Sequence, residues 1–331
     1  MRIGIVSAAK IAPPALIAPA KLVEGVEVVA VAARDQARAE AFAVEHAIPH
    51  VFGSYEELCA SDLIDAVYVA TPAALHHRWT LAALAAGKHV LCEKPFSANG
   101  PEAAEMVAAA TKADRVLMEA FHWRYHPMAA RIGEICSTQL GRLQSAAAAF
   151  TVGHIPSNDI RFDLALGGGA LMDLGVYPLQ WVRWVAHAAG HRSEPTVYAA
   201  RATCGPPEVD VTMNATLDFD AGFRADIHCS MASGVPSAAS LSVIGELGRL
   251  EVVNPIAPQM GNELTITTAA GTTTESAPTS TTYEHQLRAF VDAVEHGTPI
   301  PTGGSDSIAM MECVDAIYRA AGLQPRPSLP R

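Results

Sequence analysis

The sequence predicts an α/β protein: an N-terminal doubly wound parallel sheet, followed by an α+β part with an open, mostly antiparallel sheet. Two observations predict this class. In the first part, short and continuously apolar strands alternate with helical segments, which is typical of parallel strands covered on both faces. In the second part, strand-like runs follow one another across turns, which favours antiparallel pairing. We expect a dinucleotide-binding domain at residues 1–122 and a substrate-binding and oligomerisation domain at residues 123–331.

The strands expected in the first part are short apolar runs, at residues 2–8, 26–33, 66–72, 89–92 and 115–121. Alanine-rich segments with helical spacing lie between them, at residues 34–47, 74–87 and 98–113. Pro13 and Pro14 fit only a helix start, and Pro19 must bend or end that helix. Ligands of doubly wound sheets bind beyond the carboxyl ends of the strands, so we expect functional residues there.

The second part is expected to be mostly sheet. Its strand-like runs are residues 142–152, 196–203, 209–219, 223–230, 239–244 and 249–253. Helical patterns occur at residues 126–137, about 167–187, 281–296 and 304–321. An open sheet leaves a broad face to cover, and we therefore expect a homodimer or homotetramer that buries this face.

Composition restricts the class of protein. The formal net charge is −11, which disfavours nonspecific binding to nucleic acid or to an anionic membrane. No apolar stretch is long enough to predict a membrane span, and the start "MRIGIV" lacks the pattern of a secretory signal. The six cysteines are scattered without a CxxC pair. We therefore expect reduced thiols and a cytoplasmic protein.

The turn after the first strand has small residues where a dinucleotide-binding chain usually has glycines. It reads Ser7-Ala8-Ala9-Lys10-Ile11. Serine and alanine are small enough for backbone N–H groups to approach a pyrophosphate at a helix N-terminus. The alternative is a tight turn without a ligand, because the G-x-G-x-x-G fingerprint of the Rossmann fold is incomplete.

The end of the second strand bears on the choice between NADP and NAD. An acid there suits the ribose 2′-hydroxyl of NAD, whereas an arginine suits the 2′-phosphate of NADP. This chain has Arg34 followed by Asp35, and Arg38 one helical turn later. A guanidinium can bind a phosphate through two N–H groups, so the pattern favours NADP. NAD stays possible if Asp35 takes the ribose, and Arg34 could be an ordinary exposed charge.

Three segments in order resemble a known family. They are "ATPAALHHRWTLAALAAGKHVLCEKP" at 70–95, "EAFHWRYHP" at 119–127 and "LGGGALMDLGVYPL" at 166–179. Together they resemble the glucose-fructose oxidoreductase / inositol dehydrogenase (Gfo/Idh/MocA) family. The branch with the greatest likeness holds the dihydrodiol dehydrogenases and the NADP-dependent D-xylose dehydrogenases.

The resemblance implies roles for individual residues. Lys94 would contact both the nicotinamide ribose and the reacting hydroxyl, and Tyr177 matches an acid/base position. Asp173 lies one helical turn before Tyr177 and, as a further catalytic residue, would orient these two groups or contact a substrate hydroxyl. The residues that match the cofactor-lining positions are Thr71, Pro72, Leu75, His76, Glu93 and Arg124.

The chemistry of alcohol oxidation agrees with these roles. It needs a hydride acceptor, a base for the hydroxyl proton and a cation that favours the alkoxide. A nearby lysine ammonium would lower the pKa of Tyr177 enough to make it a base, or burial would make Lys94 itself the base. The residue types leave both assignments open.

Two further residues are candidates with alternatives. His122 could contact the nicotinamide side or a sugar hydroxyl, or it could pack. Arg161 could reach the substrate, or it could pair with Asp159 or Asp163. We expect no metal, because no histidine pair has further ligands at zinc spacing.

The sequence therefore predicts an NADP-dependent oxidoreductase that transfers a hydride between a hydroxyl-bearing carbon of a sugar or cyclic diol and nicotinamide. The substrate would be a small polyhydroxy molecule. The alternatives are an NAD-linked polyol or inositol dehydrogenase, and a non-catalytic dinucleotide-binding redox sensor. Intact Lys94, Asp173 and Tyr177 argue against the sensor.

Overall fold

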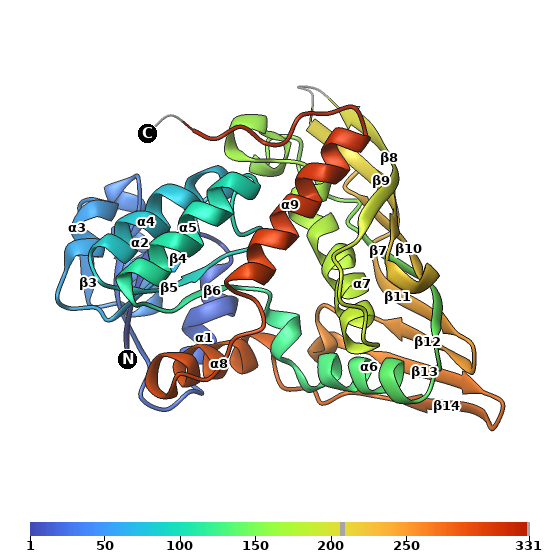
Figure 1. Ribbon diagram of the computed structural model, residues 1–331. Coiled ribbons are helices and arrows are strands. Elements are labelled where there is room, and N and C mark those ends of the chain that lie inside the picture. The colour runs from blue at the N-terminus through green and yellow to red at the C-terminus, as the bar shows by residue number, and fades with distance from the viewer. Residues whose placement is uncertain (206–208, 330–331) are drawn as a thin grey trace. The chain divides into compact units, whose positions relative to one another are not determined.

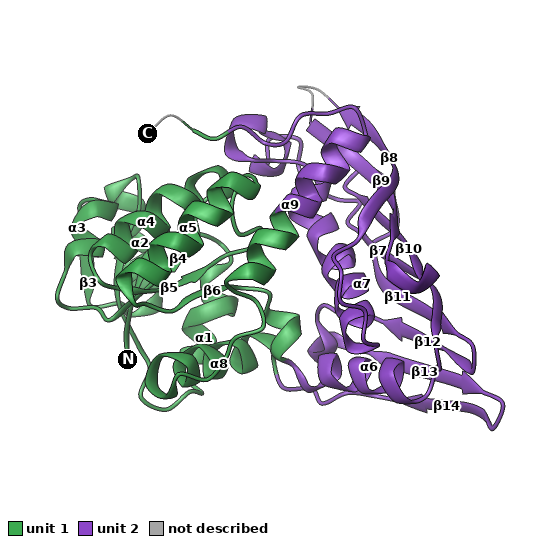
Figure 2. Cartoon of the chain, in the orientation of Figure 1, with its two compact units in different colours: residues 1–125, 281–311, 328–331 green, residues 126–280, 312–327 purple. Residues whose placement is uncertain are grey.

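The computed structural model of the 331-residue chain describes residues 1–205 and 209–329. These residues form two compact units, which Figure 2 shows in different colours. Unit 1 comprises Met1–Tyr125, Thr281–Met311 and the C-terminal residues from Ser328. Unit 2 comprises His126–Ser280 and Glu312–Pro327.

Unit 1 is built on a six-stranded sheet in the order β3-β2-β1-β4-β5-β6 (Figure 1). The strands are β1 (Arg2–Val6), β2 (Glu27–Ala32), β3 (His50–Phe52), β4 (Ala66–Val69), β5 (His89–Cys92) and β6 (Leu117–Glu119). All neighbouring pairs are parallel, which confirms the doubly wound class. Strand β3 was not predicted from the sequence, because its three residues are too few to show a pattern.

Four helices of unit 1 begin at a side-chain cap. The side chains of Asp35, Ser54, Asn99 and Thr281 accept backbone N–H groups at the starts of four helices. Those helices are α2 (Gln36–His46), α3 (Tyr55–Ala60), α5 (Gly100–Ala113) and α8 (Thr282–His296). A fifth, α4 (His76–Ala85), packs against α3 and α5. Within residues 1–205 and 209–329, no helix is long and apolar enough to cross a membrane.

The first helix is short, as its prolines predict. Pro13–Ile17 forms a π-helical turn, and α1 (Ala18–Ala20) ends directly after Pro19. Helix α1 packs against α8, although more than 250 residues separate them in sequence.

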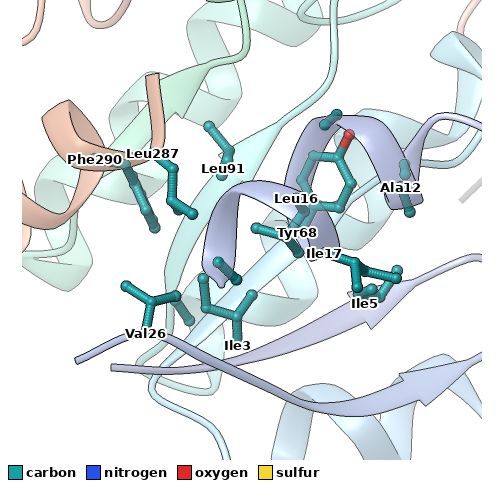
Figure 3. Close-up of a cluster of buried hydrophobic side chains, with 14 of the residues drawn as sticks. Ile3, Ile5, Ala12, Leu16, Ile17, Val26, Tyr68, Leu91, Leu287 and Phe290 are labelled. Atoms are coloured by element: carbon teal, nitrogen blue, oxygen red, sulfur yellow. The ribbon is translucent and has the colours of Figure 1, made fainter. Parts of the chain in front are cut away.

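Helix α8 completes the hydrophobic core of unit 1. Figure 3 shows Leu287 and Phe290 of α8 in one cluster with Ile3 and Leu16 from the start of the chain. All four side chains are buried. Residues 281–311 therefore pack with the first 125 residues, a pairing that helical periodicity alone does not reveal. The assignment of dinucleotide binding to residues 1–122 and of substrate binding to residues 123–331 stays a prediction, because it concerns binding.

Unit 2 is built on an eight-stranded sheet in the order β14-β13-β12-β11-β7-β10-β9-β8. Its strands are β7 (Leu143–Thr151), β8 (Thr196–Gly205), β9 (Val209–Asp218), β10 (Arg224–Ser230), β11 (Ala238–Gly245), β12 (Gly248–Val253), β13 (Glu263–Thr268) and β14 (Gly271–Glu275). Every pair is antiparallel except β7 with β10, which confirms the open, mostly antiparallel sheet.

Helix α7 (Val176–Ala188) packs against β7 and β10 on one face of this sheet, and α6 (Pro127–Thr138) packs against α7. A helix was expected from about residue 167, but the structure has 3-10 and π-helical turns before α7. The π-helical turn is Leu171–Gly175. The last helix, α9 (Ser305–Ala320), contributes residues to both units.

Candidate active site

Lys94 and Glu93 lie at the carboxyl edge of the parallel sheet, directly after β5. The Tyr68 hydroxyl donates to Glu93 Oε1 at 2.5 Å, and the Lys94 backbone N–H donates to Glu93 Oε2 at 3.3 Å. Burial and the neighbouring Glu93 raise the pKa of Tyr68 well above its usual value. Tyr68 therefore stays protonated and holds the Glu93 carboxylate in place.

His122 follows β6 and is buried against α8. Its Nδ1 lies 2.8 Å from the Thr282 hydroxyl oxygen, and its ring centroid lies 4.2 Å from that of Tyr283. Burial, together with the charge of Lys94, lowers the pKa of His122 to about 3. The imidazole is therefore neutral near pH 7, and it packs against an aromatic ring. Its contact with a substrate or cofactor stays a prediction.

His76 joins the turns that follow β4 and β5. Its Nδ1 lies 2.8 Å from the Pro95 carbonyl oxygen, and its Nε2 lies 2.8 Å from the Thr71 carbonyl oxygen. The side chain is 1% exposed. Burial lowers the pKa of His76, so the neutral imidazole donates to one of these two carbonyls, and the buried ring links Thr71 to the residue after Lys94.

Thr71 offers a buried polar group to this edge of the sheet. Its hydroxyl oxygen has no hydrogen-bond partner among the residues that the structure describes. Buried hydroxyls are nearly always bonded, so this one suits a ligand that supplies the missing partner. Pro72, which precedes the 3-10 turn Ala73–Leu75, and Leu75, which ends it, are half-buried.

The turn after β1 has the backbone conformation that its missing glycines would favour. Ser7 has a φ of 90°, in the region that glycine adopts most readily. Its N–H donates to the Ala32 carbonyl at 3.0 Å, and its carbonyl accepts the Ala9 N–H at 2.8 Å. Lys10 is exposed, Ala8 is buried and Ile11 is half-buried.

The residues after the end of β2 bear on the choice between NADP and NAD. Asp35 caps α2, because its carboxylate accepts the Arg38 backbone N–H at 2.7 Å. The Arg38 guanidinium donates to the Ala8 carbonyl at 2.7 Å. Arg34 is exposed and makes no hydrogen bond or ion pair within residues 1–205 and 209–329. The acid is therefore engaged in a cap, while a guanidinium next to it faces solvent.

Arg124 lies in the 3-10 turn His122–Tyr125 and is half-buried. Burial lowers its pKa to about 10, against the opposing effects of Tyr125 and Asp306. The side chain therefore keeps its positive charge at neutral pH.

The candidates of unit 2 lie around the start of α7. Arg161 Nε donates to Asp173 Oδ2 at 2.5 Å, and its Nη1 donates to Asp159 Oδ1 at 3.0 Å. The pair with Asp159 was one of the two expected, whereas the pair with Asp173 was not predicted. Because Asp173 lies in a π-helical turn, the α-helical spacing to Tyr177 that the sequence analysis assumed does not hold throughout.

Tyr177 is buried in the first turn of α7. Its ring packs edge-on against Phe150, with 5.6 Å between the centroids, and lies 6.3 Å from the ring of Trp181. The ring is therefore fixed by aromatic packing, as a core tyrosine would be.

Three residues that contact Glu93 or His122 were not predicted from the sequence: Tyr68, Thr282 and Tyr283. Tyr68 had a usable signal, because a tyrosine inside a fully buried strand needs a partner for its hydroxyl. Thr282 and Tyr283 had none, because no local pattern places α8 beside His122.

Among the described residues, no three His, Cys, Asp or Glu side chains gather as metal ligands would. None of the six cysteines, all of which the structure describes, forms a disulfide. Burial raises the pKa of Cys59 and Cys136 to about 12, which keeps both as thiols.

The comparisons with known proteins place the chain in a family. Residues 1–121 match the family model described as oxidoreductase family, NAD-binding Rossmann fold. Residues 134–251 match the GFO/IDH/MocA C-terminal domain. The chain therefore belongs to the Gfo/Idh/MocA family of oxidoreductases, which confirms the resemblance seen in the three sequence segments.

Individual relatives lie in the branch that the sequence indicated. A D-xylose 1-dehydrogenase (NADP(+)) from Haloferax volcanii is 36% identical over 326 residues, which cover 97% of each chain. The trans-1,2-dihydrobenzene-1,2-diol dehydrogenase of Sus scrofa is 36% identical over 233 residues, or 69% of this chain and 67% of the relative. A 3-ketoreductase from Actinomadura kijaniata, in complex with NADP and TDP-benzene, has a TM-score of 0.88, 29% identity and 97% coverage of both chains.

The low pKa of His122 makes stability depend on pH. An unfolded histidine titrates near 6.5, so between about pH 6.5 and 3 the unfolded chain binds a proton at this position and the folded chain does not. The contribution of neutral, buried His122 to the free energy of unfolding is therefore fully present above pH 6.5 and is lost as the pH falls toward 3. We expect His122→Leu to flatten the loss of stability between pH 6 and 4, as measured by urea unfolding.

Tyr283→Phe is the matched control, because it keeps His122 in place and should keep the slope. NMR of the His122 ring should show no titration between pH 8 and 5. A midpoint near 6.5 for this ring would contradict the buried neutral state.

Proposed function

We propose that this protein is an NADP-dependent oxidoreductase that transfers a hydride between the hydroxyl-bearing carbon of a sugar or cyclic diol and nicotinamide. The observation that carries the proposal is the placement of Lys94 at the carboxyl edge of a parallel sheet, beside Glu93 and neutral His122. The D-xylose and dihydrodiol dehydrogenases among the relatives support this substrate class. The proposed substrate is a small polyhydroxy molecule.

The residues of unit 1 fit a dinucleotide. The unpartnered hydroxyl of Thr71 and the small side chains of Ser7, Ala8 and Ala9 suit close approach of a polar ligand to the backbone. When bound, the nicotinamide would accept or supply the hydride. The residues proposed to hold it are Ser7, Ala8, Ala9, Lys10, Ile11, Arg34, Arg38, Thr71, Pro72, Leu75, His76, Glu93, Lys94, His122 and Arg124, and His76 would act through the backbone that it fixes. All of these residues except Arg124 lie in the proposed dinucleotide-binding domain, residues 1–122.

Two residues after the end of β2, Arg34 and Asp35, favour NADP over NAD. An acid that binds the ribose of NAD must be available, but the Asp35 carboxylate already caps α2. Arg34 is exposed and can bind a 2′-phosphate through two N–H groups. The NADP dependence of the xylose dehydrogenase and the NADP complex of the ketoreductase support the same choice.

Arg34→Ala should weaken NADPH binding by roughly 10- to 100-fold, the loss expected for a charge-assisted hydrogen bond of about 1.5–3 kcal/mol. NADH binding should change less than about twofold, because NADH lacks the phosphate. Fluorescence titration with both nucleotides measures the two effects. Arg78→Ala, an exposed arginine on α4, is the control. Equal losses for both nucleotides would show that Arg34 does not bind the phosphate.

We assign the chemistry to Lys94 and Tyr177. The Lys94 ammonium would stabilise the developing alkoxide, and Tyr177 would take the hydroxyl proton. Asp173 and Arg161 pair with each other in unit 2, and they would bind the remaining substrate hydroxyls. In this proposal His122 contributes a neutral surface to the substrate side. The substrate-binding part is proposed to be residues 123–331.

Lys94→Ala should lower kcat by about 10²- to 10⁴-fold, the range for loss of a group that assists proton transfer, while the free energy of unfolding stays within about 0.5 kcal/mol. Tyr177→Phe should lower kcat similarly and should remove the basic group from the pH profile. Turnover of sugars and trans-dihydrodiols with NADP is followed at the nicotinamide absorbance. Lys112→Ala, an exposed lysine of α5, should behave as the unaltered protein.

Near-normal turnover by Lys94→Ala would refute its role. Nucleotide binding without turnover on a broad panel would instead favour a redox sensor. Turnover with NAD alone on polyols would favour an NAD-linked polyol or inositol dehydrogenase.

We also propose a homodimer formed through the open face of the unit 2 sheet. A shallow hollow of about 490 Å³ lies on this face, lined by small side chains such as Ala147 and Ser242 and by the charged Arg201, Asp226 and Glu251. A twofold axis brings the same patch of each copy together, so charges of both signs can pair across it.

The absence of disulfides fits a protein that acts in the cytoplasm, which cell fractionation tests directly.

Light scattering after gel filtration should give twice the chain mass of 34.8 kDa. Ala147→Arg/Ser242→Arg places like charges in the hollow and should produce monomers, whereas Lys112→Glu on α5 should not. A tetramer that the double variant splits into dimers would extend the proposal. If the unaltered protein is monomeric at micromolar concentration, the proposed homodimer is wrong.

A further inference from the structure

A fully buried ion pair lies in unit 2 outside the residues assigned above. Asp210 of β9 is 0% exposed, Arg326 after α9 is 3% exposed, and their side chains pair directly. Replacing a buried ion pair by apolar side chains of similar size is often neutral or stabilising, because both charges must be removed from water. Stability alone therefore gives a poor account of this pair.

The pair binds the backbone on both sides of Gly169. Arg326 Nε donates to the Gly168 carbonyl at 2.6 Å, and Asp210 Oδ2 accepts the Leu171 N–H at 2.8 Å. The Tyr318 hydroxyl donates to Asp210 Oδ1 at 3.0 Å. The carbonyl before Gly169 and the N–H two residues after it are thus held by two side chains that also hold each other.

Gly169 is required here for space. A side chain at this position would meet Asp210 and Arg326, and its Cβ would lie 2.8 Å from the Tyr318 hydroxyl. Its φ of 140° is also a conformation that other residues rarely adopt. The pattern "LGGG" by itself does not indicate contact with Asp210, an acid about 40 residues later.

The turn that is held this way leads directly to the proposed catalytic helix. The Asp173 N–H donates to the Gly169 carbonyl at 2.9 Å, and the Gly169 N–H donates to the Arg161 carbonyl at 3.0 Å. Asp173, Arg161 and the start of the helix that carries Tyr177 therefore all take their position from Gly169.

We propose that Asp210 and Arg326 are positioning residues for the reaction. They fix the turn at Gly168–Leu171 and so set the placement of Asp173 and Tyr177, without contacting substrate themselves. This inference rests on the proposed function for its catalytic consequence. Its structural consequence, an ordered helix start, can be measured without turnover.

The test compares two multiple variants. Asp210→Leu/Tyr318→Phe/Arg326→Met replaces the network by apolar side chains, and Asp210→Asn/Arg326→Gln keeps hydrogen-bonding groups without charge. In the apolar variant we expect amide exchange of Leu171 to rise at least tenfold and kcat to fall at least tenfold. We expect NADPH affinity to stay within twofold, because the proposed cofactor residues belong to unit 1. The polar variant should recover most of both losses.

The control is Arg183→Met/Glu194→Leu, which removes another ion pair of α7, with a 2.7 Å contact, beyond Tyr177. It should leave Leu171 exchange and kcat within twofold. Urea unfolding of every variant separates a loss of position from a loss of stability. If the apolar variant does not fold, Tyr318→Phe is measured in its place, and we expect smaller changes in Leu171 exchange and kcat in the same directions.

Unchanged Leu171 exchange and kcat in a folded apolar variant would overturn the inference, as would a control variant with equal effects. If the unaltered protein turns over no substrate of the panel, the proposed function fails. The exchange comparison then still decides whether Asp210 and Arg326 order the helix start.

Discussion

The site of unit 1 depends on one constraint: a parallel strand covered on both faces can present polar side chains to a ligand only where it ends. Strand β5 is apolar and buried from Val90 to Cys92, and Glu93 and Lys94 come immediately after it. Tyr68 is the exception within β4, and its hydroxyl is satisfied by Glu93. The buried strand thus fixes the acid that lies beside the lysine.

The same edge controls charge as well as position. The buried His76 ring lies within hydrogen-bond distance of the carbonyls of Thr71 and Pro95 and donates to one of them, so it links the turns after β4 and β5. Burial and the positive charge of Lys94 keep His122 neutral. A second positive charge therefore does not arise beside Lys94 at neutral pH. An ammonium flanked by a carboxylate and a neutral ring is suited to a hydroxyl that develops negative charge.

The sequence was informative where one local pattern determines one structure. Apolar runs predicted five of the six strands of unit 1, because a strand that is buried on both faces consists of consecutive apolar residues. The ends of these predicted strands indicated Lys94 and Arg34 as functional residues. Long-range pairing was not predictable. Nothing near residue 282 indicates that Thr282 contacts His122, and nothing near residue 326 indicates that Arg326 binds Asp210. The π-helical turn at Leu171–Gly175 also escaped, since its sequence suits an α-helix equally well.

Two positions with small side chains show why a glycine motif is an incomplete guide to a site. At Ser7 the backbone needs a positive φ but has space, so serine can replace glycine at a modest conformational cost while its neighbours hold the turn by hydrogen bonds. At Gly169 the missing side chain is itself the requirement, because a buried ion pair and a tyrosine hydroxyl occupy its place. A fingerprint that counts glycines treats the two alike. The physical difference explains how this chain departs from the usual pattern in its first turn and keeps glycine beside its candidate catalytic helix.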